Sequence, residues 1–187
     1  MSANWSRTCC WRGSGHTGDV RVSPPAARAG RLLGLLVALW VTVPGVLHPL
    51  NPGWLSGVNL IFHEAGHMLL MFAGEIPMLL GGSLLQVLVP GACVAAFLGR
   101  GDRFAAGLTT LWLAHSLSGV AAYIRDAPGR DLPLITGDPD THDWWQLLGG
   151  WNALDAADPL GRFVLFLAYA AVVGGVLLAL WDEVAAP

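Results

Sequence analysis

The sequence contains no lysine and few charged residues of any kind, and each shortage excludes a class of function. Only 12% of its 187 residues are charged, against roughly 25% in an ordinary soluble domain. All ten basic residues are arginine, and they form no basic patch interleaved with aromatic residues, so we expect no nucleic-acid partner. The three cysteines have no spacing typical of a disulfide framework or a thiolate zinc site.

Hydrophobic residues make up 54% of the sequence and fall into long runs. They predict an all-α fold, a polytopic bundle of about five transmembrane helices in contact with the lipid bilayer. The runs are residues 32–47, 54–72, 83–98, 104–124 and 160–181. Residues 1–30 lack hydrophobic periodicity and are expected to form a disordered cytoplasmic tail. Residues 31–187 are expected to form a single membrane-embedded domain.

The distribution of arginine predicts the orientation, because cytoplasmic loops of membrane proteins carry an excess of basic residues. Five arginines precede the first hydrophobic run, which places the N-terminus in the cytoplasm. If all five runs cross the membrane, the C-terminus lies outside. The second run then carries residues 63–67 past the middle of the bilayer, toward the cytoplasmic side.

Residues 63–67 read His-Glu-Ala-Gly-His and lie inside the second hydrophobic run. His63 and His67 are four residues apart, so on a helix they share one face and can bind a single Zn²⁺ ion. Glu64 lies beside them and is a candidate general base for hydrolysis. Ionisable side chains at membrane depth are costly, which makes this motif a candidate functional site.

A catalytic zinc site needs at least three protein ligands, and the loop at 125–159 offers candidates for the third. His142 is favoured because imidazole is the commonest metal ligand, with Asp143 as the alternative. A third interpretation gives neither a metal role. In it, residues 143–148 form an interfacial tryptophan-containing helix that Asp143 caps.

Two more polar residues are candidates for supporting roles around the metal. His115, in the fourth run, is either a hydrogen-bond donor to a ligand, an oxyanion stabiliser or a fourth ligand, or else a bundle histidine bonded to a neighbouring carbonyl. Asp126 is either the partner of a ligating histidine's second nitrogen or an interfacial ion-pair partner of Arg125 or Arg130. In the segment before the third run, Gly74 fits the end of the metal-binding helix, and Gly81-Gly82 fits a tight re-entry into the membrane.

Six short motifs between residues 55 and 150 together resemble a group of small bacterial membrane proteins related to site-2-protease-like zinc peptidases. The motifs are Phe62-His63-Glu64-Ala65-Gly66-His67, Gly81-Gly82-Ser83-Leu84-Leu85-Gln86, Trp112-Leu113 with Ser116-Leu117, Asp126-Ala127, Leu132-Pro133-Leu134 and His142-Asp143-Trp144.

The resemblance implies that His63 and His67 bind zinc and that Glu64 is the catalytic base. It also implies a membrane protein or peptide as substrate and a location in the bacterial cytoplasmic membrane. The Asp-Gly sequence that supplies the third ligand in site-2 proteases is absent from this chain. His142 or Asp143 would have to take its place.

Two functional interpretations therefore remain. The first is an intramembrane zinc-dependent hydrolase, most simply a peptidase. The alternative is a non-hydrolytic membrane protein that binds zinc, iron or haem through His63, His67, His115 and His142. Small residues such as Ala171 and Gly175 in the last run permit helix pairing and thus a homo-oligomer.

Overall fold

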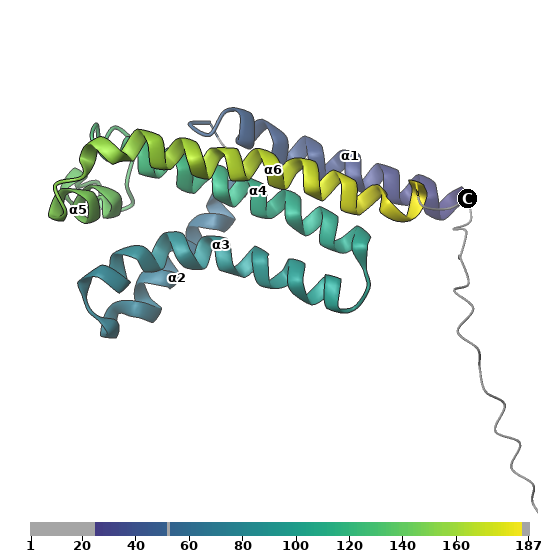
Figure 1. Ribbon diagram of the computed structural model, residues 1–187, viewed down its shortest axis with the longest axis horizontal. Helices are drawn as coiled ribbons and strands as arrows, with labels where there is room; N and C mark the ends of the chain where they lie inside the picture. Colours follow the sequence, from purple (N-terminus) through teal and green to yellow (C-terminus); the bar gives the residue numbers. More distant parts are fainter. Residues whose placement is uncertain (1–24, 52, 185–187) are drawn as a thin grey trace, which may run out of the picture.

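The computed structural model describes residues 25–51 and 53–184, and this part of the chain folds into helices joined by short loops (Figure 1). The helices are α1 (Pro25–Leu47), α2 (Leu55–Leu70), α3 (Glu75–Gly99), α4 (Arg103–Asp126), α5 (Asp143–Gly150) and α6 (Ala157–Val184), with 3₁₀ helices at Met71–Ala73, Pro139–Thr141 and Leu154–Ala156. The all-α prediction is therefore confirmed. Most of the predicted N-terminal tail, residues 1–24, lies outside the described residues, whereas residues 25–30 already belong to α1.

Helix α4 lies at the centre of the bundle and packs against α6, α3 and α1. One apolar cluster joins Leu35 in the middle of α1 to Leu111 in α4 and Ala179 near the end of α6. A second cluster joins Val46 at the end of α1 to Ala114 and Ala168. The order of contacts shows that α1 and α4 run in the same direction and that α6 runs against them.

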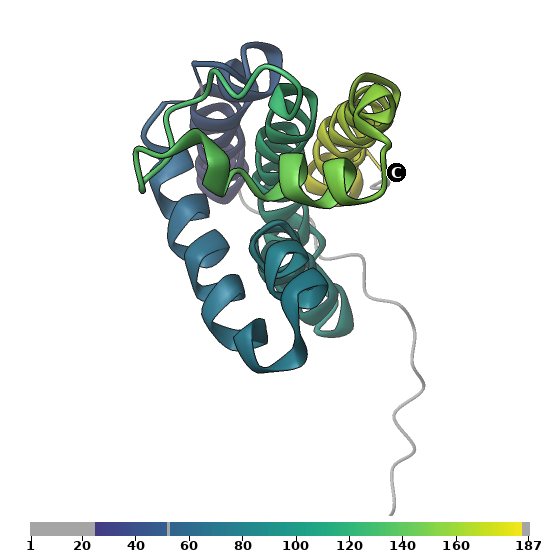
Figure 2. The same cartoon turned by 90° about the vertical axis from the view of Figure 1, so that its left-hand side faces the viewer.

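The bundle consequently has two distinct ends (Figure 1). At one of them α1 begins, α3 is connected to α4, and α6 ends; we call it the arginine end, after Arg28, Arg31, Arg100 and Arg103. The other end carries α5 and the loop that leads to it from α4, and we call it the α5 end. Figure 2, viewed from the α5 end, shows α2 and α3 as a pair that extends to one side of α1, α4 and α6.

Three helical segments are long and apolar enough to cross a membrane: α1, α3 and residues Leu154–Trp181. Large hydrophobic side chains such as Trp40, Phe166 and Leu177 are exposed on their surfaces, as expected where helices face lipid. Five spans are not confirmed. Helix α2 has only 16 residues, about 24 Å at the helical rise per residue, less than the roughly 30 Å of the hydrocarbon core.

Glycines bring α2 and α3 into close contact. A Cβ atom added at Gly66 would overlap the carbonyl oxygen of Gly81, and one added at Gly81 would lie 2.5 Å from the carbonyl oxygen of Gly66. The predicted re-entry at Gly81-Gly82 is wrong, since both residues lie inside α3. Their small size serves helix packing, as is common in membrane bundles. The turn comes earlier, at Gly74, the residue before α3. Its φ of 106° lies in the region that favours glycine.

Candidate metal centre

Two histidines of α2 and the first residue of α5 bring their side chains together. His63 Nε2 lies 3.0 Å and His67 Nε2 lies 3.2 Å from Asp143 Oδ2. One potential ligand atom from each residue lies within 4.8 Å of the others. His63 and Asp143 are buried and His67 is half-buried. The four-residue spacing places both imidazoles on one face of α2, and α5 supplies the carboxylate from a distant part of the chain.

The opposite nitrogen of each imidazole is held by an acceptor. His67 Nδ1 donates to the backbone carbonyl of Met78 over 2.8 Å, so this nitrogen carries a hydrogen. His63 Nδ1 lies 3.2 Å from Gln86 Oε1, and the amide of Gln86 is oriented by donation from its Nε2 atom to the carbonyl of Ser116. Both histidines therefore carry hydrogen on Nδ1, as metal-binding histidines do when their second nitrogen is fixed by hydrogen bonding.

This arrangement leaves three acceptors facing one another. A neutral imidazole with hydrogen on Nδ1 has a lone pair on Nε2, and both Nε2 atoms point at the same carboxylate oxygen. Burial raises the pKa of Asp143, but hydrogen bonds donated by His63 and His67, which need a proton on Nε2, outweigh burial and hold that pKa below its ordinary value. The carboxylate is thus ionised at neutral pH. Lone pairs directed at an anion repel it unless a proton or a metal cation lies between them.

Gly82 allows α3 to pass close to this group. A Cβ atom added at Gly82 would lie 2.6 Å from the Nε2 atoms of both His63 and His67. Any other residue would block the nitrogens that face Asp143. The next residue, Ser83, accepts a hydrogen bond from Trp144 Nε1 over 3.0 Å, which fixes the start of α5 against α3 and so positions the Asp143 carboxylate.

Glu64 differs from its histidine neighbours in burial. Its side chain is exposed on α2, whereas His63 beside it is buried against α3. The exposed residues around it on α2 are apolar and include Ile61 and Met68. The Glu64 carboxylate therefore lies on the surface of α2, next in the sequence to the buried imidazole of His63.

His142, the favoured third ligand, is not brought into this group. Its Nδ1 accepts the backbone N–H of Trp145 over 3.2 Å and thereby caps α5. The cap is therefore His142. The interpretation of the sequence in which Asp143 caps this helix is wrong. The ring stacks on Tyr123 with a centroid distance of 4.1 Å, and its Nε2 lies 3.3 Å from Asp126 Oδ2. Burial lowers the pKa of His142, which keeps the capping imidazole neutral.

Asp126 organises the loop that leads to α5. Its two carboxylate oxygens accept the backbone N–H groups of Asp131 and Leu132 over 3.0 and 3.1 Å. The histidine that it faces is His142, which is not one of the three grouped residues. The predicted ion-pair partners bind other carboxylates: Arg125 pairs with Asp158 and Arg130 with Asp140. Within the part of the chain that the structure describes, Asp126 thus makes no hydrogen bond or ion pair to the three grouped residues. It influences them by holding the loop that leads to Asp143.

His115 belongs to a buried polar network beside His63. Its Nδ1 lies 3.0 Å from Asn59 Nδ2, and Asn59 Oδ1 accepts hydrogen bonds from Trp112 Nε1 and Ser116 Oγ. Asn59 precedes His63 by one helical turn and shares its buried face.

Sequence reasoning missed several residues around the histidines. Asn59 stands four residues before His63, and this spacing predicts that the two share a face of α2. Gln86 appears in one of the short motifs, but the sequence alone predicts no role for it. Tyr123 was also missed; its hydroxyl accepts the backbone N–H of Asp143, and its ring meets that of His63 at a centroid distance of 5.5 Å.

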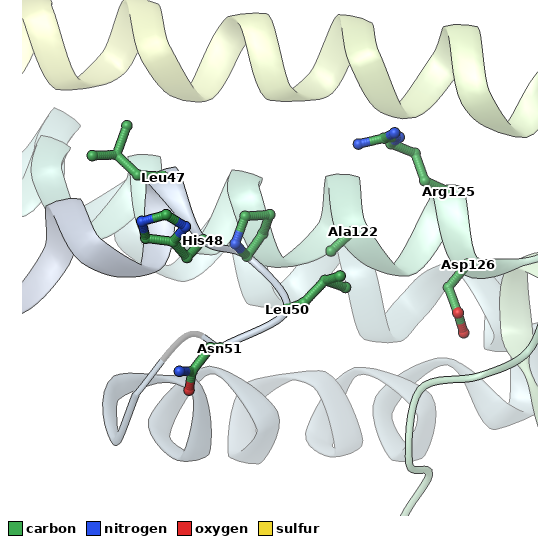
Figure 3. Close-up of a pocket in the computed structure, with 8 residues that line it drawn as sticks. Leu47, His48, Leu50, Asn51, Ala122, Arg125 and Asp126 are labelled. Carbon is green, nitrogen blue, oxygen red and sulfur yellow. The ribbon is translucent and has the colours of Figure 1, made fainter.

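A separate cavity of about 820 Å³ lies at the α5 end, between the α1–α2 connection and the end of α4 (Figure 3). It is lined by residues 47–51 together with Ala122, Arg125 and Asp126. None of the three grouped residues lines it, so it is not the space in which a metal would be held.

No protein-family model, curated protein or solved structure matches the chain. The resemblance to site-2-protease-like peptidases therefore rests on the short motifs alone.

Proposed function

We propose that this protein is a membrane-embedded, zinc-dependent hydrolase, most simply a peptidase that cleaves a membrane-associated polypeptide. The observation that carries the proposal is the convergence of His63 Nε2 and His67 Nε2 on Asp143 Oδ2 while both Nδ1 atoms are engaged by acceptors. A proton on one imidazole would satisfy one of these contacts, whereas a metal cation would satisfy all three donor atoms at once.

The donor set fits zinc. Two imidazole nitrogens and one carboxylate oxygen are ligands typical of catalytic zinc, with a fourth position left for water or substrate. In a tetrahedral site with metal–ligand bonds of about 2.0–2.1 Å, neighbouring donor atoms lie about 3.3 Å apart. The nitrogen–oxygen distances of 3.0 and 3.2 Å are close to that value. The same donors also bind Fe(II), so the identity of the metal is part of the test.

Each residue has a defined role in the proposed reaction. His63, His67 and Asp143 would hold the zinc, which supplies a Lewis acid that polarises the scissile carbonyl and acidifies water. Glu64 would take a proton from the attacking water and deliver it to the leaving amine. A helical substrate has to unwind locally beforehand, because its backbone groups are otherwise hydrogen-bonded internally within the bilayer.

The proposal includes a membrane arrangement in which α4 crosses the bilayer together with α1, α3 and α6. Helix α4 has 24 residues, about 36 Å at the helical rise, and it packs along α1 and α6 through both apolar clusters. Its polar side chains, such as Thr110 and Ser118, are buried inside the bundle rather than exposed to lipid. Helices α2 and α5 then complete the metal centre without crossing.

The test combines metal analysis with cleavage assays on the full chain purified in detergent. We expect about one zinc per chain in the wild type and in Glu64→Gln, because Glu64 is not a ligand. Mass spectrometry of a panel of synthetic transmembrane peptides should show cleavage by the wild type only. A chelator should abolish that cleavage, and added zinc should restore it.

Three outcomes would contradict the proposal. Absence of bound metal after purification in the presence of zinc would remove its basis. Equal cleavage by Glu64→Gln would exclude Glu64 as the general base. One bound metal with no cleavage of any peptide would favour the non-hydrolytic metal-binding alternative.

A further inference from the structure

The arginine end of the bundle is defined by contacts between elements that are far apart in the sequence. The guanidinium of Arg31 near the start of α1 lies 5.5 Å from the ring centroid of Phe104 at the start of α4. The guanidinium of Arg103 lies 5.6 Å from the ring centroid of Trp181 near the end of α6. The start of α1, the α3–α4 connection and the end of α6 therefore lie together at one end of the bundle, which is one face of the membrane in the proposed arrangement.

The metal centre lies toward the opposite end. Asp143 is the first residue of α5, and the α1–α2 connection lies beside Asp126 at the α5 end (Figure 3). Helix α2 follows this connection and runs away from the arginine end, to the place where α3 begins (Figure 1). His63 and His67 are thus reached from the face of the membrane on which the loop between α4 and α5 lies.

The arginines are divided unequally between the two ends. Four of them, Arg28, Arg31, Arg100 and Arg103, lie at the arginine end, and Arg7, Arg12 and Arg21 precede α1 in the sequence. Only Arg125, Arg130 and Arg162 belong to the α5 end. Short connections that are rich in arginine stay in the cytoplasm during insertion. The arginine end is therefore the cytoplasmic one.

From this arrangement we infer that the metal centre opens toward the extracytoplasmic side of the membrane. Its substrates are then polypeptide segments presented at that side, at or just beyond the outer end of a membrane span. The topology rests on the fold and the arginines alone, while the substrate class also rests on the proposed hydrolase function. If all five hydrophobic runs crossed the membrane, His63 and His67 would lie toward the cytoplasmic side. With four crossing helices and an α2 that does not cross, they lie toward the opposite side.

Cysteine labelling in intact cells tests the topology. In the full chain with Cys9, Cys10 and Cys93 replaced by serine, single cysteines are introduced as Gly99→Cys at the arginine end and Ile135→Cys at the α5 end. Both positions are exposed, and a Cβ atom at Gly99 meets nothing within 4 Å. A membrane-impermeant maleimide should label Ile135→Cys in intact cells and Gly99→Cys only after permeabilisation.

Every other labelling pattern overturns the inference. Labelling of Gly99→Cys alone in intact cells would place the metal centre on the cytoplasmic side. Labelling of both or of neither would mean that the two ends are not on opposite sides in a single orientation. Since labelling requires neither metal nor catalysis, its result is independent of whether the chain is a hydrolase.

A second measurement addresses the side of the membrane from which the metal centre is reached. In right-side-out membrane vesicles, an impermeant chelator added outside should remove zinc from the wild type. Zinc that leaves only from inverted vesicles would contradict access from the extracytoplasmic side. If labelling and chelation agree with the inference but no peptide is cleaved, the topology stands and the proposed hydrolase function falls.

Discussion

His142 and Asp143 are consecutive residues, yet their side chains serve different structures. Asp143 Oδ2 lies 3.0 Å from His63 Nε2, whereas His142 Nδ1 accepts the N–H of Trp145 and caps α5. The first residue of α5 thus takes part in the candidate metal centre, and the residue before it stabilises the helix that carries it. Substitutions at the two positions should separate metal binding from helix stability.

Replacing each of the two by asparagine makes a matched pair of variants. We expect Asp143→Asn to lose most of its zinc, because it removes the only anionic donor of the group. His142→Asn should keep its zinc, since asparagine is a good helix N-cap. Elemental analysis after dialysis measures both. Zinc retained in Asp143→Asn and lost in His142→Asn would reassign the third ligand to His142.

Gly82→Ala should abolish metal binding although it alters no ligand. Its Cβ atom would lie 2.6 Å from the Nε2 atoms of His63 and His67, so one imidazole or the whole of α3 has to shift. Gly91→Ala on the same helix is the control, because its Cβ atom meets nothing within 4 Å. Normal zinc content in both variants would show that α3 does not limit access to the two nitrogens.

The contact between α2 and α3 should contribute strongly to stability. Gly66→Ala forces a methyl group onto the carbonyl of Gly81, and overpacking of this kind typically costs about 1–3 kcal/mol. Gly57→Ala on the same helix has open space around it and should leave stability unchanged or slightly raised. Thermal unfolding in detergent compares the two. An equal Tm for both would mean that the helices separate at little cost.

The sequence predicted the elements of this fold better than their connections. Long hydrophobic runs predicted the helices, and the spacing of His63 and His67 predicted that they share a face of α2. Five spans are not confirmed, because a short apolar helix such as α2 has the composition of a span without its length. Gly81-Gly82 has the composition of a turn, but in the fold these glycines allow two helices to touch.

The choice between His142 and Asp143 could not be made from residue chemistry. Both are good zinc ligands, and they stand on either side of a helix start, where neighbouring side chains point in different directions. Which of them faces His63 depends on how Asp126 and the loop hold α5 against α3. These contacts join distant parts of the chain and leave no periodic pattern in the sequence.

Gln86 provides the last prediction, because it hydrogen-bonds to His63 but does not belong to the candidate metal-binding group. Its Oε1 accepts from His63 Nδ1, and its Nε2 donates to the carbonyl of Ser116. Gln86→Leu removes both bonds, and we expect zinc affinity to fall about 10–100-fold, the usual effect of removing a hydrogen-bond partner of a metal-binding histidine.

Gln86→Glu is the matched variant, since it keeps an acceptor for His63 and should lose less affinity than Gln86→Leu. Competition with a fluorescent zinc chelator measures all three proteins, and circular dichroism checks that each is folded. Wild-type affinity in folded Gln86→Leu would show that the orientation of His63 is set by α2 alone and does not require the hydrogen bond from α3.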